Sequence, residues 1–183
     1  MIPLSIETLE DGWCHYALSL TKFNVIPGNK YYKNYKDTFI LGKTDPTSND
    51  SDVIVFARCD IETAEIPPFV KIIGPFSFAG CHLQGIEFLG DSQLERIEKS
   101  AFYSSRLEEA TLPSSLKSIG RKSFAFCKKL HSIDFDENSE LQIIDEKAFF
   151  MSNIQYLEIP RMDGAMALKI YMNAKFCQMA RII

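Results

Sequence analysis

One short apolar pattern occurs four times in the 183-residue chain. The first copy begins at Ile73 and reads Ile-Gly-x-x-x-Phe-x-x-Cys-x-Leu-x-x-Ile-x-Phe, and the following copies start 24, 22 and 25 residues further on in turn. The four isoleucines, and the phenylalanines five residues after them, are Ile73, Ile97, Ile119, Ile144, Phe78, Phe102, Phe124 and Phe149. A period of about 20–29 residues is typical of repeats that each form one coil of a solenoid. The repeat therefore constrains the fold more tightly than any other feature of the chain.

Each copy ends in an apolar–polar–apolar triplet, the shortest strand that can bury one face. In a stacked solenoid these triplets pair as a parallel sheet with strands about 4.8 Å apart, and the phenylalanines stack in one continuous core. The predicted fold class is an α/β repeat, a curved solenoid with a parallel β-sheet on its concave face. The repeats are predicted to fill residues 53–160, with coils that begin near residues 53, 70, 94, 116 and 141.

The segments on either side of the repeats are predicted to be caps. Residues 1–52 concentrate aromatic side chains where the first coil would otherwise expose its apolar edge to water. Their last part predicts two strands, Phe39–Gly42 and Val53–Phe56, joined by an exposed polar loop. In residues 161–183, apolar side chains recur at helical spacing, which predicts an amphipathic C-terminal capping helix. The alternative is a helix that binds a membrane or a partner's groove.

The repeat sequence resembles a known family. The complete pattern from Ile119 to Ile133 looks like the BspA-like class of leucine-rich repeats. Residues 101–107 and 148–154 resemble the shorter variant of that repeat, and residues 56–67 are similar to the segment that introduces the repeats in protist members. The resemblance covers roughly residues 53–160. It implies a curved solenoid that binds proteins, often as a surface antigen or adhesin, with no catalytic residues.

Composition disfavours two classes of partner. A formal net charge of −4 and a pI near 5.4 argue against nucleic acid, whose phosphates require clustered Lys and Arg. No stretch approaches the 18 or more apolar residues of a membrane span, and the first residues lack the pattern of a signal peptide. The resemblance nevertheless implies a cell-surface or secreted protein, so the sequence leaves the location open.

No motif in the sequence predicts catalysis. The chain lacks a nucleophile elbow, a phosphate loop, a dinucleotide fingerprint and a zinc-protease motif, and its three histidines are scattered. Its five cysteines include no Cys-x-x-Cys pair, and Cys81 and Cys127 share one repeat position, where packing is the favoured role. We therefore expect a protein that is not an enzyme, with no cofactor and no metal site.

The middle residue of each strand triplet is expected to point outward, because its neighbours point inward. In chain order these residues are Glu65, Glu87, Thr111, Asp134 and Glu158. Neighbouring carboxylates about 5 Å apart repel by roughly 1 kcal/mol in water, and a basic protein surface or a divalent cation would offset the repulsion. The alternative is a polar face that is simply solvated. Further candidate partner-binding residues on this face are Glu109, His131 and Tyr156.

Two functions from different classes fit these observations. The first is a non-catalytic protein-binding module, by resemblance a surface antigen or adhesin, that binds a protein on the concave sheet face. The second is a scaffold or self-assembling protein that associates through the solenoid ends or the C-terminal helix. The chain is expected to be a monomer or a weak dimer.

Overall fold

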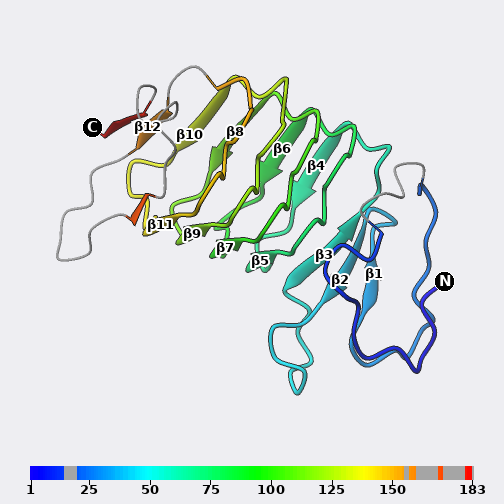
Figure 1. Ribbon diagram of the computed structural model, residues 1–183. Coiled ribbons are helices and arrows are strands. Elements are labelled where there is room, and N and C mark those ends of the chain that lie inside the picture. Colours follow the sequence, from blue (N-terminus) through cyan, green and yellow to red (C-terminus); the bar gives the residue numbers. More distant parts are fainter. Residues whose placement is uncertain (15–19, 155–156, 160–168, 171–179, 183) are drawn as a thin grey trace.

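The computed structural model describes residues 1–14, 20–154, 157–159, 169–170 and 180–182, and within these ranges the chain forms β-strands and no helix. The strands lie in two rows along the molecule (Figure 1). One row is an eight-stranded sheet of β1 (Lys33–Tyr35), β2 (Phe39–Gly42), β3 (Val53–Ala57), β5 (Ile72–Ile73), β7 (Arg96–Ile97), β9 (Ser118–Ile119), β11 (Ile143–Ile144) and β13 (Lys169–Ile170). The other row, which we call the paired-strand face, consists of β4 (Thr63–Ile66), β6 (Gly85–Phe88), β8 (Glu109–Leu112), β10 (Ser132–Phe135), β12 (Leu157–Ile159) and β14 (Ala180–Ile182).

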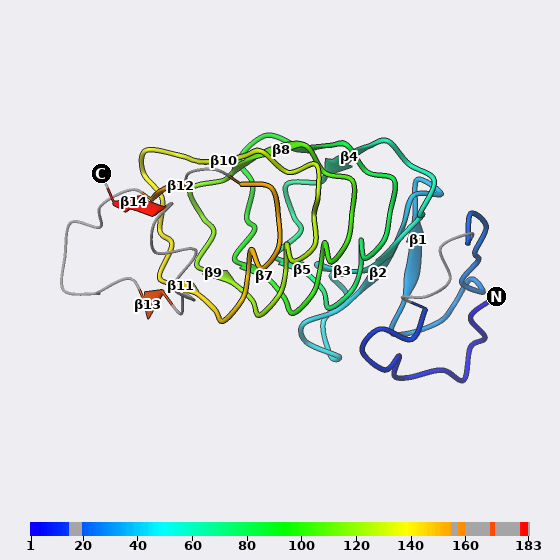
Figure 2. The ribbon, with the colours of Figure 1, turned by 45° about the horizontal axis from the view of Figure 1, so that its top comes forward.

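Successive coils stack in parallel and in register. In the eight-stranded sheet Ile73 is opposite Ile97, Ile97 is opposite Ile119, and Ile119 is opposite Ile144. Each coil runs from the eight-stranded sheet through a turn to the paired-strand face and then returns, as Figure 2 shows along the stack. The predicted repeat solenoid with parallel strands is therefore confirmed.

The predicted phenylalanine column forms the centre of the core. Phe78 lies 5.0 Å from Phe102, Phe102 lies 5.0 Å from Phe124, and Phe124 lies 5.3 Å from Phe149, measured between ring centroids, with interplanar angles of 17°, 6° and 9°. All four rings are buried. Offset or parallel stacking of this kind adds about 0.5–1.5 kcal/mol per pair beyond the area that the rings bury. The column therefore stabilises each coil against the next one.

A second column carries small polar or polarisable side chains, which are buried in the first three coils and half-buried in the fourth. The position three residues after each core phenylalanine holds Cys81, Ser105, Cys127 and Ser152 in successive coils, which places the two cysteines where their spacing predicts. The thiol of Cys127 lies 3.0 Å from the Phe102 carbonyl oxygen and 3.4 Å from the Ser105 hydroxyl. Burial raises the pKa of Cys127 to about 11, so its thiol is protonated at neutral pH. These cysteines pack between coils as small apolar side chains with weak hydrogen-bonding capacity.

Glycine at the start of the turn is required by close backbone contact. A Cβ atom on Gly120 would lie 2.8 Å from the carbonyl carbon of Glu98 and 2.9 Å from the Ile97 oxygen, and one on Gly74 would lie 2.7 Å from the Ile54 oxygen. The neighbouring coil is itself backbone at these points and cannot move aside. The two glycines are therefore structural, as the repeat position predicts.

The paired-strand face is divided into strand pairs: β4 with β6, β8 with β10, and β12 with β14. Within a pair, the residue after the second strand donates a backbone bond to the first strand: Leu89 to the Ile66 oxygen at 3.0 Å, and Asp136 to the Leu112 oxygen at 3.3 Å. The corresponding residue after β8 is Pro113, which has no N–H. It cannot make the same bond to β6, and the hydrogen-bonded sheet is interrupted between β6 and β8.

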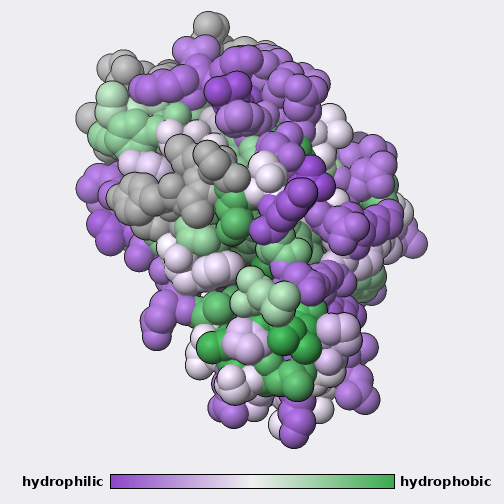
Figure 3. Space-filling model, turned by 90° about the vertical axis from the view of Figure 1, so that its right-hand side faces the viewer, coloured by the Kyte–Doolittle hydropathy of each residue, from purple (hydrophilic) through white to green (hydrophobic). Residues whose placement is uncertain are grey.

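The N-terminal end begins with antiparallel strands. The predicted strands are present as β2 and β3, which pair with each other, and β1 adds the outer edge. Phe39 of β2 packs 5.9 Å from Phe78, and Trp13 and Phe23 pack on Phe56 at 5.8 and 5.2 Å, so aromatic side chains extend the core past the first coil. Seen from this end, hydrophobic residues gather in the lower part of the surface and hydrophilic residues cover the upper part (Figure 3).

The prediction of a C-terminal helix over residues 161–183 is wrong for the residues of that segment that the structure describes. Lys169–Ile170 and Ala180–Ile182 are strands, paired in parallel with β11 and β12. Here the open edges of β11 and β12 offer backbone partners, and pairing with them outweighs local helical preference. The rest of the predicted helix lies outside the described residues.

Candidate partner-binding face

The middle residues of the strand triplets lie on the surface. Glu65, Glu87, Thr111, Asp134 and Glu158, which we call the outward column, are all exposed. In β4 and β8 the residues on either side of the outward residue are buried, which is the alternation that a half-buried strand requires. The sequence therefore predicts correctly which side chains leave the core here.

The outward column is not uniformly acidic. Glu65 lies opposite Glu87 and Thr111 opposite Asp134 in the parallel registers. At the C-terminal end the backbone register places Glu158 opposite Arg181 of β14, a basic residue. The residue pattern places Arg181 on a helix and so misses this position.

Some carboxylates on this face lie beside basic side chains. The Glu65 carboxylate lies 3.8 Å from the Lys36 ammonium, and that of Glu109 lies 3.8 Å from Nε2 of His131. The hydrogen bond and charge of Lys129, at 2.9 Å, lower the pKa of Glu108. In the part of the chain that the structure describes, Glu87 and Asp134 form no ion pair. Among the described residues, nothing offsets these two charges directly.

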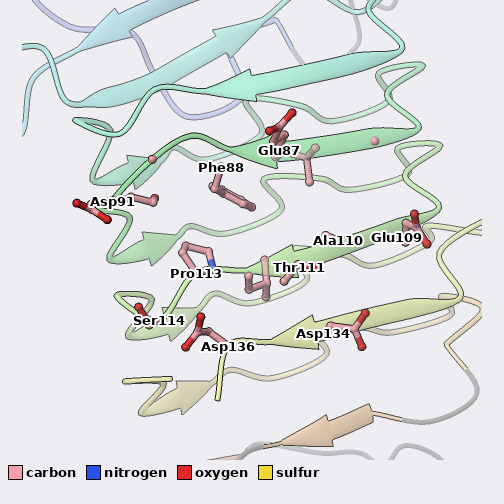
Figure 4. A pocket seen from close by; sticks show the side chains of 15 residues that line it. Glu87, Phe88, Asp91, Glu109, Ala110, Thr111, Pro113, Ser114, Asp134 and Asp136 are labelled. Atoms are coloured by element: carbon pink, nitrogen blue, oxygen red, sulfur yellow. The ribbon is translucent and has the colours of Figure 1, made fainter. Parts of the chain in front are cut away.

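A groove of about 760 Å³ opens where the sheet is interrupted (Figure 4). It runs between β6 and β8, and Phe88 of β6 lies in the space between these two strands. Four apolar side chains form much of its floor: Ile86, Phe88, Ala110 and Leu112. Ile86 and Phe88 are only half-buried, whereas the corresponding residues of β4, Ala64 and Ile66, are 2% and 0% exposed. β6 therefore leaves apolar surface partly uncovered, as does β10 at the half-buried Phe135, whereas β4 and β8 bury both of their inward residues.

The groove is bordered by acidic side chains from three coils. The carboxylates that line it are Glu87, Asp91, Glu109, Asp134 and Asp136. Its lining contains no lysine, arginine or histidine. One of these carboxylates, Asp136, accepts a backbone hydrogen bond from Asn138 at 2.8 Å. The groove therefore combines an apolar floor with a strongly negative rim.

The structure brings some predicted site residues together and separates others. Glu87, Thr111, Asp134 and Glu109 line the groove, whereas Glu65 and Glu158 lie outside it. His131 is exposed beside Glu109, and Tyr156 lies outside the described residues.

Sequence reasoning misses two acidic residues of the groove, Asp91 and Asp136, because they belong to loops rather than to the strand triplets. The lengths of the loops in the sequence do indicate these two residues. The loops after β6 and β10 are longer than those after β4 and β8, and each carries an aspartate near its start. Comparing loop lengths between repeats would identify them.

The described ranges show no cluster of potential metal ligands. No group of three or more His, Cys, Asp or Glu side chains is placed there to hold a metal ion. The two histidines with a described position, His82 and His131, are both exposed.

The parallel stacked coils define this chain as a leucine-rich-repeat solenoid. A profile for the BspA type leucine rich repeat region matches residues 52–176 as six copies. The chain therefore belongs to the BspA-type leucine-rich repeat family, whose repeats are in general non-enzymatic. No match to the chain was found among curated proteins.

Solved structures of bacterial proteins share this fold. The pneumococcal vaccine antigen PcpA is 28% identical with a TM-score of 0.56, over 75% of this chain and 36% of PcpA. A leucine-rich repeat protein from Eubacterium ventriosum is 21% identical with a TM-score of 0.69, and the match covers 87% of this chain and 41% of the Eubacterium chain. The chain thus spans well under half the length of either protein.

The structure contains no helix, in the portion it describes, that is long and apolar enough to cross a membrane.

Proposed function

We propose that this protein is a non-catalytic protein-binding module that binds a protein partner on its paired-strand face. The observation that carries the proposal is the groove between β6 and β8, which exposes apolar surface on an otherwise polar sheet. Half-buried apolar side chains rimmed by polar ones are typical of interaction sites. The outward column extends the same surface over the neighbouring coils, as in other solenoids that bind partners along one face.

We further propose that the protein acts at the cell surface, as an antigen or adhesin. The support is membership in the BspA-type family together with the likeness to a pneumococcal protein described as a vaccine antigen.

Capture of the partner with two matched variants tests the proposal. Thr111→Arg adds one positive charge and a long side chain at the centre of the paired-strand face, and His82→Arg does the same at an exposed position outside the groove. We expect immobilised wild-type protein to retain a partner from extracts of the producing cells. Thr111→Arg should reduce the retained amount by about tenfold or more, as expected for blocking the centre of an interface.

The control variant, His82→Arg, distinguishes blocking of the paired-strand face from a general effect of added charge. His82→Arg should retain the partner within about twofold of the wild type, as a peripheral substitution does. A partner retained equally by Thr111→Arg and the wild type would contradict binding on this face. Equal loss in both variants would also contradict it, because only non-specific charge would then matter.

Self-association through the N-terminal end is a second candidate. Strand β1 is the outer edge of the eight-stranded sheet, and Leu4 and Trp13 are 54% and 39% exposed in the same N-terminal segment. An open strand edge beside exposed apolar side chains can pair with another copy. Light scattering over a range of concentrations tests it: a mass that rises with concentration supports assembly, and a constant monomer mass excludes it.

A further inference from the structure

The groove between β6 and β8 has a chemistry that selects one kind of side chain. Its floor offers the half-buried surfaces of Ile86 and Phe88, and its rim carries five carboxylates with no basic residue in the lining. A purely apolar ligand would remove those carboxylates from water without a compensating contact. A ligand that satisfies both parts must be apolar along its length and cationic at its tip.

Lysine and arginine side chains have this form, because an aliphatic stem carries the charged group. The stem would lie on Phe88, and the ammonium or guanidinium group would reach the rim, where Glu87 and Asp134 form no ion pair with described residues. Asp91 lines the groove from the loop after β6 and adds a third carboxylate.

The sheet interruption supplies a backbone acceptor as well. The Ile66 and Leu112 carbonyl oxygens each accept a bond from the next coil, at 3.0 and 3.3 Å. The corresponding oxygen, that of Phe88, receives no such bond because Pro113 has no N–H. It therefore presents an acceptor on the β8 side of β6, where an N–H donor of a ligand can bond to it.

A divalent cation fits this site less well than an organic cation. The acidic residues line an elongated groove, and no group of three described His, Cys, Asp or Glu side chains is placed to coordinate a metal together. Calcium requires six to eight converging oxygen ligands. A metal ion would also leave the apolar floor uncovered.

We propose that the β6–β8 groove is a binding site for the lysine or arginine side chain of an extended basic segment on the protein partner. The inference rests on the proposed function, since it assigns the partner chemistry to the same face. The inference goes beyond the proposed function because it names the groove as the specific site and a lysine or arginine side chain as its occupant.

Defined peptides test the inference without the natural partner. A fluorescent peptide of alternating serine and lysine is titrated into the full chain, followed by anisotropy at about 20 mM salt, where electrostatic contacts are least screened. Two matched peptides replace lysine with norleucine, which keeps the stem without the charge, or with diaminobutyric acid, which keeps the charge on a shorter stem. We expect the lysine peptide to bind about tenfold or more tightly than either, because each lacks half of the complementarity.

Two double variants of the protein locate the binding. Glu87→Gln with Asp134→Asn removes two carboxylates from the groove, and Glu137→Gln with Glu140→Gln removes two exposed carboxylates outside its lining. The first should weaken the lysine peptide by about tenfold or more, and the second should leave its affinity within about twofold. Circular dichroism and melting curves establish that both variants fold.

Three results would overturn the inference: equal binding of the lysine and diaminobutyric peptides, equal weakening by the two double variants, or no binding at all. A melting temperature raised by about 1 mM calcium in the wild type but not in the groove variant would also overturn it, because the site would then hold a metal ion. If the lysine peptide fails while Thr111→Arg still abolishes partner capture, this inference fails and the proposed function stands. If the peptide binds in the groove while capture is unaffected by Thr111→Arg, the proposed function fails.

Discussion

At the scale of single residues, two core serines carry hydroxyl groups without a hydrogen-bond partner. Ser77 and Ser123 are buried immediately before core phenylalanines, and in the part of the chain that the structure describes their Oγ atoms have no partner. The same position in the other coils is alanine, at Ala101 and Ala148. Leaving a buried hydroxyl unsatisfied costs free energy that an alanine does not cost.

Ser123→Ala should therefore raise the free energy of unfolding by about 1 kcal/mol in urea titrations. The control is Ser105→Ala, which removes a buried hydroxyl that lies 3.4 Å from the Cys127 sulfur and should lower stability. A loss of stability in Ser123→Ala equal to that of the control would show that the Ser123 hydroxyl has a partner after all.

Asp52 is a buried charge that the fold does satisfy. Burial alone would raise its pKa, but hydrogen bonds from the Thr44 hydroxyl at 2.7 Å and the Thr44 amide at 2.8 Å, with Lys71 at 3.5 Å, lower it below 3.8. A carboxyl whose pKa is lower in the folded state stabilises the protein at neutral pH, and that contribution is lost as the pH falls through the folded pKa.

Asp52→Asn should therefore lower the free energy of unfolding by about 1–3 kcal/mol at pH 7. The difference from the wild type should shrink as the pH falls below 3.8, measured by denaturant unfolding at a series of pH values. A difference that stays constant from pH 7 to pH 3 would contradict the assigned role of the charge.

At the scale of elements, the neighbouring strands β4 and β6 place Glu65 and Glu87 opposite each other. Like charges directly opposite destabilise a strand pair, and Lys36 at 3.8 Å from Glu65 offsets only part of the repulsion. Glu87→Gln should therefore raise the melting temperature by about 1–3 °C at low salt. The gain should vanish in about 1 M salt, where the Debye length falls to about 3 Å. A fall in melting temperature at low salt would contradict the repulsion.

Some features of the strands and coils can be predicted from the residue pattern, and others cannot. Columns such as Phe78, Phe102 and Phe124 follow directly from spacing, because each coil repeats the same path. The interruption between β6 and β8 depends instead on the position of Pro113 opposite β6. This position follows from the contact between two coils and cannot be seen in one repeat alone. In the same way, the position of Asp91 in the groove depends on the fold of the loop after β6.

At the scale of the whole molecule, both rows of strands continue into the C-terminal segment. β13 pairs with β11 and β14 pairs with β12, so this segment covers edges that would otherwise be exposed. The spacing of apolar residues wrongly predicts a helix for this segment. Spacing alone does not show that β11 and β12 have open edges with which the segment can pair. In a solenoid each coil is stabilised by its neighbours, and the terminal coil has a covering role whatever its secondary structure.

Deletion of residues 161–183 should therefore lower the melting temperature by about 5 °C or more and lower solubility, because apolar edges become exposed. Differential scanning fluorimetry and the soluble yield after expression measure both effects. A truncated chain that melts and dissolves like the full chain would contradict the covering role.

The central claim is that a protein partner contacts the paired-strand face, and site-specific photo-crosslinking measures this contact most directly. A photoreactive phenylalanine analogue replaces Thr111 on the face in one variant and His82 outside the groove in another, both exposed positions. On irradiation with extracts of the producing cells, the Thr111 variant should form a discrete cross-linked band and the His82 variant should not. A band from the His82 variant alone, or the same band from both, would contradict the claim.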